Sequence, residues 1–250
     1  MIFLRPNLRT SGSKIAHPET VPDWPSLFRE QALVVEDQRL KCFYEAGVPS
    51  AETPLSEVSF VAMDFETTGL DSRKHDIVSI GLVPFDLKRI RCRDSRHWII
   101  SPSRPLVEKS VVFHGITHSD VVDAPDLSAI IAPLLESLAG RIAVVHYRTI
   151  ERGFLDRGFK SRLNEGIHFP VVDTMDLEAR IHRQKPTGFW ARLMGKKPVS
   201  IRLADSRTRY NLPYYAPHHA LTDALATAEL LQAQIADRYS PDTPISEIWR

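Results

Sequence analysis

Two acidic residues, Asp64 and Glu66, stand two residues apart at the end of an apolar run. Successive side chains of a strand point to opposite faces, so period-two alternation places both carboxylates on the same side. Two carboxylates that face one way repel each other, and a divalent cation between them removes that repulsion. The pair alone is compatible with a metal site but does not establish one. The alternative is that one of the acids caps the turn that follows.

A third carboxylate and a histidine occur together near the end of the chain. His218 precedes Asp223 by five residues, at the start of an expected helix. Acids that hold metal ions and an imidazole that accepts a proton from water are the usual ingredients of metal-assisted hydrolysis. A Thr-Thr-Gly-Leu segment follows Glu66, and its glycine, Gly69, allows the backbone to turn sharply towards a ligand.

The elements that must position these residues follow from hydrophobic periodicity. Apolar runs predict strands at 58–64, 77–83, 97–100, 141–146 and 171–173, the first three in an antiparallel meander. Apolar spacings of three and four residues predict helices at 26–46, from 123–126 to 138, at 149–157 and at 218–236. Strands that form a meander and then alternate with helices indicate an α/β fold, with a mixed five-stranded sheet flanked by helices.

The two ends of the chain differ from its centre. Residues 1–56 are rich in proline and show no convincing strand. A segment this short rarely folds alone, so we expect an N-terminal, mainly helical extension that packs on the main domain. The main domain is expected at 57–240, followed by a C-terminal tail at 241–250.

One segment of the main domain, an insertion at 179–204, is basic throughout. It contains seven Lys or Arg residues, among them Arg192, Lys196 and Lys197, and no acid. Two interpretations stay open. The segment is either a solvated loop and helix, or a basic flap that holds a phosphate backbone while Phe189 or Trp190 stacks on a base.

Composition excludes disordered, collagen-like, coiled-coil and membrane-spanning proteins. Hydrophobic residues make up 43% and charged residues 25% of the chain, and no apolar window approaches the ~18 residues of a membrane helix. Lys and Arg (32) balance Asp and Glu (31), so a polyanion partner must be held by a local patch or by metal ions. The two cysteines, Cys42 and Cys92, cannot form a disulfide framework. We expect a cytoplasmic protein with no membrane partner.

Three motifs resemble, in this order, those of the DEDD superfamily of 3′→5′ exonucleases. They read Asp64-Phe-Glu66-Thr-Thr-Gly-Leu70, then His114-Gly-Ile-Thr117, then His218-x-Ala-x-x-Asp223. The histidine spacing resembles the branch with a catalytic histidine (DEDDh). The chain looks most similar to the proofreading epsilon subunit of bacterial DNA polymerase III and to epsilon-like stand-alone exonucleases. The resemblance spans about 58–236 and implies an RNase H-like fold.

The resemblance also implies a catalytic site with two Mg²⁺ or Mn²⁺ ions. Asp64 would bridge both ions, and Glu66 and Asp223 would complete their coordination. His218 would be the general base. The adjacent His219 would be structural or a minor substrate contact.

Substrate contacts are implied in the same way. The Thr67 backbone and the Leu70 side chain resemble positions that face the terminal nucleotide. Phe113 and His114 resemble a loop that lines the pocket for the terminal sugar and base. His114 and a second histidine four residues later also have the spacing of a zinc pair, but the intervening Gly115 favours a loop.

The second motif departs from the family pattern. Where the family usually carries His-Asn-x-x-Phe-Asp, this chain reads His146-Tyr147-Arg148-Thr149-Ile150-Glu151. Tyr147 replaces Asn, Ile150 replaces Phe as an apolar wall of the substrate site, and Glu151 replaces the fourth carboxylate. We expect Glu151 to retain metal binding. The alternative is that it only offsets the positive end of its helix.

The function implied by the resemblance is that of a metal-dependent 3′→5′ exonuclease. It would release nucleoside monophosphates from single-stranded or frayed 3′ ends, of DNA rather than RNA, and a separate polymerase chain is a candidate partner. Two alternatives stay open. One is an RNA-specific exoribonuclease of the same family. The other, motivated by Tyr147 and Glu151, is a nucleic-acid end-binding module with weakened or lost turnover.

Overall fold

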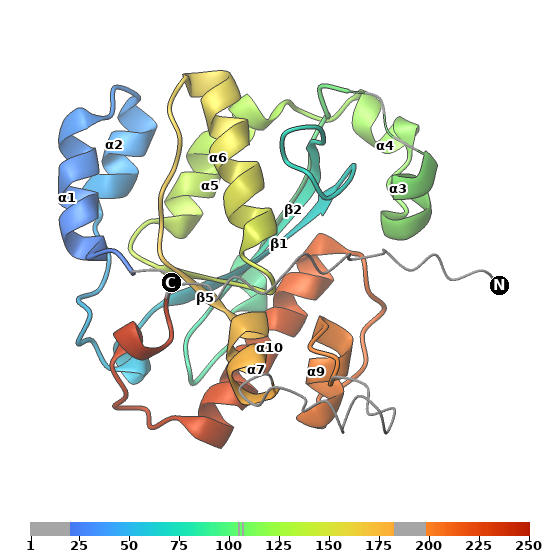
Figure 1. Cartoon of the computed structure of the whole chain (residues 1–250). Coiled ribbons are helices and arrows are strands. Elements are labelled where there is room, and N and C mark those ends of the chain that lie inside the picture. Colours follow the sequence, from blue (N-terminus) through green and yellow to red (C-terminus); the bar gives the residue numbers. More distant parts are fainter. Residues whose placement is uncertain (1–20, 105, 107, 183–198) are drawn as a thin grey trace, which may run out of the picture.

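A computed structural model describes residues 21–104, 106, 108–182 and 199–250. Its centre is a mixed sheet with the strand order β3-β2-β1-β4-β5 (Figure 1). The strands are β1 (Phe60–Thr67), β2 (Ile77–Phe85), β3 (Arg96–Ile99), β4 (Ile142–Val145) and β5 (Val171–Asp173). The first three strands form an antiparallel meander, and β4 and β5 run parallel to β1. The five-stranded mixed sheet predicted from the sequence is confirmed.

Helices cover both faces of this sheet. The long helix α10 (Ala220–Arg238) crosses β1 and β2 on one face, and α5 (Leu127–Leu138) and α6 (Thr149–Leu163) lie on the other (Figure 1). Further helices are α3 (Glu108–His114), α4 (His118–Val122), α7 (Thr174–His182) and α9 (Leu203–Arg209), with 3-10 turns at Leu55–Glu57, Cys92–Asp94 and Ile245–Glu247. Of the helices described, none has the length and apolar character needed to cross a membrane.

The central strand β1 extends beyond its predicted end. Residues 60–63 are fully buried, because β1 has a strand on each side and helices on both faces. The prediction ended this strand at Asp64, but pairing with β2 continues as far as Thr67. Glu66 is therefore a strand residue, and its side chain lies on the same face as that of Asp64.

The single helix predicted at 26–46 is wrong, because the chain breaks at 35–37 into α1 (Trp24–Val34) and α2 (Gln38–Glu45). The carboxylate of Glu165 accepts hydrogen bonds from the backbone N–H groups of Glu36 and Asp37, both at 2.8 Å. The Asp37 side chain in turn caps α2 by accepting from the N–H of Arg39 at 2.9 Å. The helices pack on each other, and α2 also contacts α5.

Three other predicted boundaries shift. The helix predicted at 149–157 continues to Leu163, where Asn164 ends α6 in a left-handed conformation. The last helix begins at Ala220 rather than at 218, because the preceding residue is its N-cap. Phe113 and His114, expected in a loop, are the last two residues of α3, which stops where Gly115 adopts a φ of 70°.

The basic insertion at 179–204 is described only at its two ends. Residues 179–182 belong to α7, and residues 203–204 begin α9. Phe189, Trp190, Arg192, Lys196 and Lys197 lie outside the described residues, so the flap stays a prediction.

The last residues of the chain return to the edge of the sheet. Arg250 exchanges two backbone hydrogen bonds with Val171 of β5, at 3.1 and 2.8 Å. Ile245, Ile248 and Trp249 are buried in the main hydrophobic core. Residues 241–250 therefore cover the β5 edge and add apolar side chains to the core.

Candidate active site

Three carboxylates from two elements meet on one face of the sheet. Asp64 and Glu66 project from β1, and Asp223 projects from the first turn of α10. One oxygen from each of the three lies within 4.8 Å of the others. The first two share a face because they are two residues apart in a strand, and α10 packs against that strand. Acids far apart in the sequence thereby form one cluster.

A glycine in β2 allows α10 to approach the sheet this closely. Gly81 pairs directly with Asp64 across the two strands. A Cβ atom at Gly81 would lie 2.3 Å from the carbonyl carbon of Ala220, a distance that real Cβ atoms do not show. The sequence patterns did not point to Gly81. The available signal was a glycine inside a strand, which often marks a close approach of another backbone.

The carboxylates of the cluster lie where negative charge is unfavourable. Burial, and then the charges of Glu151, Asp223 and Glu66, raises the pKa of Asp64 well above its ordinary value. Burial and the charge of Asp223 raise the pKa of Glu66 to about 8. Burial also raises the pKa of Asp223, although the N–H of His218 opposes this shift. Protons or a cation must therefore neutralise part of the charge.

Glu151 lies beside the cluster rather than inside it. It belongs to the first turn of α6, is 2% exposed, and is not one of the three acids within 4.8 Å of one another. Its charge nevertheless contributes to the raised pKa of Asp64. Burial raises the pKa of Glu151 itself to about 8, and its Oε2 has no hydrogen-bond partner among the described residues. Carboxylate oxygens suit Mg²⁺ or Mn²⁺, so this donor set fits such an ion.

The two adjacent histidines have different environments. His218 adopts a left-handed φ of 71°, and its N–H donates to Oδ2 of Asp223 at 2.8 Å. His219 instead caps α10, since its Nδ1 accepts from the N–H of Thr222 at 3.3 Å. Its ring centroid lies 4.8 Å from that of His97 on β3. Of the two, His218 is the one that lines the cavity beside the carboxylates.

That cavity has a volume of about 540 Å³. It is lined by Asp64, His218 and Asp223, and also by α9 and the segment at 212–217. Arg202 and the 80%-exposed Tyr214 are among its lining residues. The guanidinium of Arg202 and the ring of Tyr214 therefore line the same cavity as the carboxylates.

A buried arginine holds the α9 side of this cavity in place. Arg207 is 4% exposed and donates to the carbonyl oxygens of Ala226 at 2.6 Å and Pro213 at 2.8 Å. It also pairs with Glu229 at 2.7 Å, and its guanidinium lies 4.6 Å from the ring centroid of Tyr215. Arg207 therefore ties α9 and the segment before His218 to α10. Arg207 belongs to no motif, so the sequence did not predict this role.

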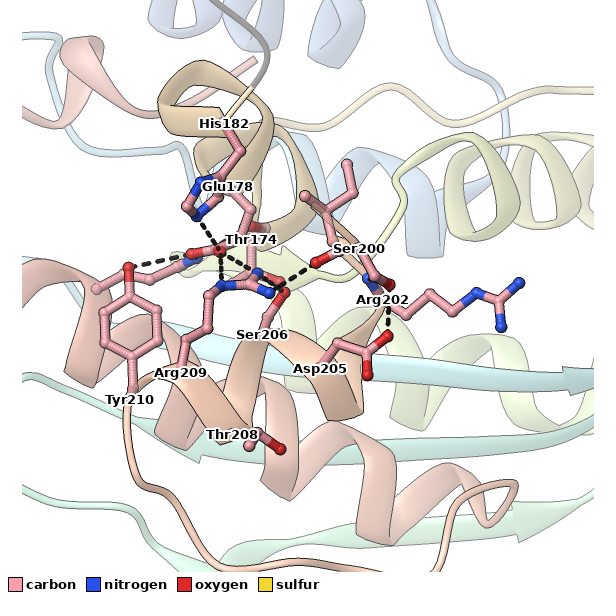
Figure 2. Close-up of polar contacts among 12 residues, drawn as sticks. Thr174, Glu178, His182, Ser200, Arg202, Asp205, Ser206, Thr208, Arg209 and Tyr210 are labelled. Atoms are coloured by element: carbon pink, nitrogen blue, oxygen red, sulfur yellow. Dashed lines mark hydrogen bonds and ion pairs between the residues drawn. The ribbon is translucent and has the colours of Figure 1, made fainter. Parts of the chain in front are cut away.

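A buried carboxylate fixes α9 from the other side (Figure 2). Glu178 of α7 is fully buried and accepts hydrogen bonds from the Tyr210 hydroxyl at 3.0 Å, the Gln234 amide at 2.9 Å and the Arg209 guanidinium. Figure 2 shows Arg209 and Tyr210 pointing towards Glu178, with His182 beside it. The α9 wall is thus held against both α7 and α10.

Comparison with known proteins assigns the family. The model of the exonuclease family (RNase T) matches residues 61–231, which is most of the chain and includes every residue of the carboxylate cluster. The chain belongs to the exonuclease family.

Two bacterial relatives of this exonuclease family member carry DNA polymerase III names. It is 29% identical over 196 residues to the PolC-type DNA polymerase III of Bacillus subtilis, and 31% identical over 180 residues to a DNA polymerase III subunit epsilon-like protein of Rhodobacter capsulatus. The alignments cover 76% and 72% of this chain but 13% and 24% of the relatives. The chain therefore spans a quarter or less of the length of these relatives.

Solved structures share the exonuclease fold. Exonuclease X in complex with 5′-overhanging duplex DNA matches with a TM-score of 0.55 and 20% identity, covering 74% of this chain and 96% of that chain. The nuclease domain of 3′hExo, a DEDDh family member bound to rAMP, matches with a TM-score of 0.57 and 16% identity, covering 72% and 92%. At these identities the likeness shows the fold, which is the RNase H-like fold expected from the sequence.

The residues expected to contact substrate come from two parts of the fold. Thr67 ends β1, and its hydroxyl donates to the carbonyl oxygen of Gly69 at 2.8 Å. This bond shapes the turn that leaves the Leu70 side chain 83% exposed. A large apolar side chain in that position is available to a ligand.

The second group comes from α3 and α6. Burial, and then the proximity of His218, lowers the pKa of His114, whose Nδ1 accepts from the N–H of Ile116 at 3.0 Å. The backbone of Phe113 lies in α3, but its side chain is outside the described part of the structure. Ile150 is half-buried and packs against the main core at the start of α6.

His146, the first residue of the second motif, is a structural part of the cavity wall. Its Nδ1 lies 2.8 Å from Oγ1 of Thr174, and its Nε2 lies 3.1 Å from the carbonyl oxygen of Ile201. Burial lowers the pKa of His146 to about 4, so the imidazole is neutral at physiological pH. His146 and Asp64 line the same cavity.

Proposed function

We propose that this protein is a metal-dependent 3′→5′ exonuclease that releases nucleoside monophosphates from unpaired 3′ ends. The observation that carries the proposal is the cluster of Asp64, Glu66 and Asp223, with one oxygen from each within 4.8 Å, beside a cavity that His218 also lines. Membership of the exonuclease family supplies the class of reaction.

The proposed metal ligands are Asp64, Glu66 and Asp223, with Glu151 as a fourth carboxylate that approaches from α6. Two ions are proposed because the four carboxyl groups all have raised pKa values. Four carboxylates carry more negative charge than one divalent ion would neutralise. Bound there, Mg²⁺ or Mn²⁺ would lower the pKa of the attacking water and offset the charge that develops on the phosphate.

His218 is the proposed general base and would accept the proton of the attacking water at its imidazole. Its backbone N–H is held by Asp223 at 2.8 Å, so the imidazole and a metal ligand are positioned by the same short segment. Arg207 supports this arrangement, because it holds the carbonyl of Pro213 just upstream.

The cavity suits a strand end that is not base-paired, because no terminal nucleotides need to be melted before they enter. Arg202 offers positive charge to phosphate, and the exposed Leu70 offers an apolar surface to the terminal base. Thr67, Phe113, His114 and Ile150 complete the proposed contacts to the terminal nucleotide.

DNA is the proposed substrate, because the curated relatives are DNA polymerase III chains. The same relatives support a separate polymerase chain as a partner. RNA is the second candidate, and the observation in its favour is the shared fold with a nuclease domain bound to rAMP.

A direct test uses one oligonucleotide sequence as single-stranded DNA and as RNA, each labelled at the 5′ end, with Mg²⁺, Mn²⁺ or a chelator. The proposal expects a ladder that shortens from the 3′ end only when metal is present. Asp64→Asn should abolish this ladder. Asp237→Asn is the matched control, because Asp237 lies at the far end of α10 with 52% of its side chain exposed.

Each outcome assigns a function. Degradation of DNA in preference to RNA supports the proposal as stated, and the reverse preference makes the protein an exoribonuclease. Tight binding of both polymers without any shortening in either metal would overturn the proposal and leave an end-binding module.

A further inference from the structure

Two bulky residues of the described chain have a left-handed backbone. One, His218, lines the cavity of the candidate site, and the other, Tyr147, follows a residue that does. The non-glycine residues with positive φ are Asn164 (59°), Asn211 (54°), His218 (71°) and Tyr147 (102°). Asparagine adopts this conformation readily, whereas an aromatic residue does so rarely. Tyr147 is the larger departure, since its φ lies well outside the left-handed well near 60°.

A buried carboxylate imposes this conformation on Tyr147. Asp173, which is 3% exposed at the end of β5, accepts hydrogen bonds from the N–H of Tyr147 at 3.1 Å and of Arg148 at 3.0 Å. The carbonyl oxygen of Tyr147 accepts from the N–H of Ile150 at 3.0 Å as α6 begins. All these contacts are made by backbone groups of Tyr147 and its neighbours, so they would persist with any side chain at position 147.

The side chain of Tyr147 contributes little to the fold. It is 47% exposed. Within the described ranges its hydroxyl makes no hydrogen bond, and its ring joins neither an aromatic pair nor the packed core. Glycine or asparagine would suit this backbone better than tyrosine. Strained residues that persist in this way concentrate at functional sites, where the strained side chain serves a ligand.

Tyr147 directly follows His146, a residue of the cavity wall. β4 runs parallel to β1 with Ala62 opposite Val144, so the next residues of the same register bring His146 alongside Asp64. Both line the 540 Å³ cavity. The contacts proposed for the terminal nucleotide come from the β1 turn, from α3 and from Ile150 of α6, whereas Tyr147 precedes α6 on the β4 side of β1.

We propose that Tyr147 stacks on a nucleobase of the substrate strand, the one that precedes the terminal nucleotide. This inference rests on the proposed exonuclease function and specifies how the same site holds the rest of the strand. A neutral aromatic ring offers a π-face to any base, so it binds an unpaired strand without selecting its sequence. The backbone hydrogen bonds fix the direction in which the Tyr147 side chain leaves the chain before the strand arrives.

The test compares two variants with a matched control. Tyr147→Phe keeps the ring and the strained backbone, whereas Tyr147→Gly removes both. Asn164→Gly is the control, because Asn164 is also left-handed but lies at the opposite end of α6. Measurements are kcat and KM on single-stranded DNA, the thermal midpoint, and the fluorescence of 2-aminopurine placed second from the 3′ end of an oligonucleotide bound in Ca²⁺.

We expect Tyr147→Gly to raise KM and the dissociation constant about ten-fold, the order of magnitude of one lost stacking contact. Its thermal midpoint should equal or exceed that of the wild type, because the backbone strain is relieved. Stacking quenches 2-aminopurine, so the quenching should be lost in this variant and retained in Tyr147→Phe. The Asn164→Gly control should match the wild type in kcat, KM and quenching.

Unchanged affinity and unchanged quenching in Tyr147→Gly would overturn the inference. A lowered thermal midpoint that tracks the loss of affinity would also overturn it, because Tyr147 would then be a structural residue. The binding readout needs no turnover. Quenching that depends on Tyr147 in a wild-type protein that shortens no strand would uphold stacking and reject the exonuclease proposal.

Discussion

The N–H of His218 donates a 2.8 Å hydrogen bond to Oδ2 of Asp223, which joins the proposed general base to a proposed metal ligand within one turn of chain. The bond forms because His218 adopts a φ of 71° just before α10 begins. The position of the imidazole and the position of the carboxylate are therefore set together. Any displacement of the start of α10 would move both.

Replacing His218 by asparagine should remove the base while preserving the fold. Asparagine adopts a left-handed backbone readily, so the N–H bond to Asp223 can remain. Loss of a general base typically lowers kcat by about 10²–10⁴-fold. Steady-state kinetics on single-stranded DNA should show that loss with little change in KM. His219→Asn is the control and should stay near wild type, because asparagine is also a good N-cap. Equal losses in both variants would contradict the assignment.

Adding one methyl group at Gly81 should separate the two halves of the carboxylate cluster. The new Cβ would lie 2.3 Å from the backbone of Ala220, so α10 must move away from β2 and carry Asp223 with it. We expect Gly81→Ala to lose at least ~1–3 kcal/mol of stability and to bind Mn²⁺ more weakly. Chemical denaturation and calorimetry measure the two effects.

Gly153→Ala is the matched control for this substitution. Its Cβ would meet the Ser72 side chain, with the hydroxyl at 3.2 Å and the Cβ at 3.7 Å. The hydroxyl can move, and alanine favours the interior of α6. Its stability should be unchanged or higher. A stable, metal-binding Gly81→Ala protein would show that α10 does not need to lie so close to the sheet.

Features of the fold and the site that depend on neighbouring residues could be predicted from the sequence, and those that depend on distant residues could not. Period-two alternation was enough to place Asp64 and Glu66 on one face, because it depends only on neighbouring residues. The break between α1 and α2 depends on Glu165, which lies more than one hundred residues away along the chain. The need for glycine at position 81 likewise depends on Ala220. Local patterns contain no information about such distant partners.

The metal-free protein should lose stability as the pH rises. The pKa values of Glu66 and Glu151 are raised to about 8 from an ordinary 4.5, so the folded state binds more protons than the unfolded state between these values. Stability then decreases with pH over this range and levels off above it. In a chelator, the thermal midpoint should fall by several degrees from pH 5 to pH 9.

Divalent metal should reverse this trend, because ions replace protons as the source of positive charge. The rise in midpoint caused by Mn²⁺ should therefore be larger at pH 9 than at pH 5. A Glu66→Gln, Glu151→Gln double variant should flatten the pH dependence in the chelator. A midpoint that is already flat in the wild-type protein would contradict the raised pKa values.

The proposed role of Glu151 as a metal ligand can be tested by shortening its side chain or by removing its charge. If its unpaired Oε2 serves a metal ion, Glu151→Gln should lower activity at least ~10-fold and weaken Mn²⁺ binding, because a charged oxygen ligand is lost. Glu151→Asp keeps the charge and should retain activity within about ten-fold of wild type.

The metal-free stability of Glu151→Gln distinguishes the two roles considered for this residue. A buried carboxylate that awaits a cation destabilises the metal-free fold, so the neutral glutamine should raise the thermal midpoint in a chelator at pH 8 to 9. A carboxylate that only stabilises the positive end of α6 would give the opposite result, a lower midpoint with unchanged metal affinity. That outcome would reduce the proposed ligand set to Asp64, Glu66 and Asp223.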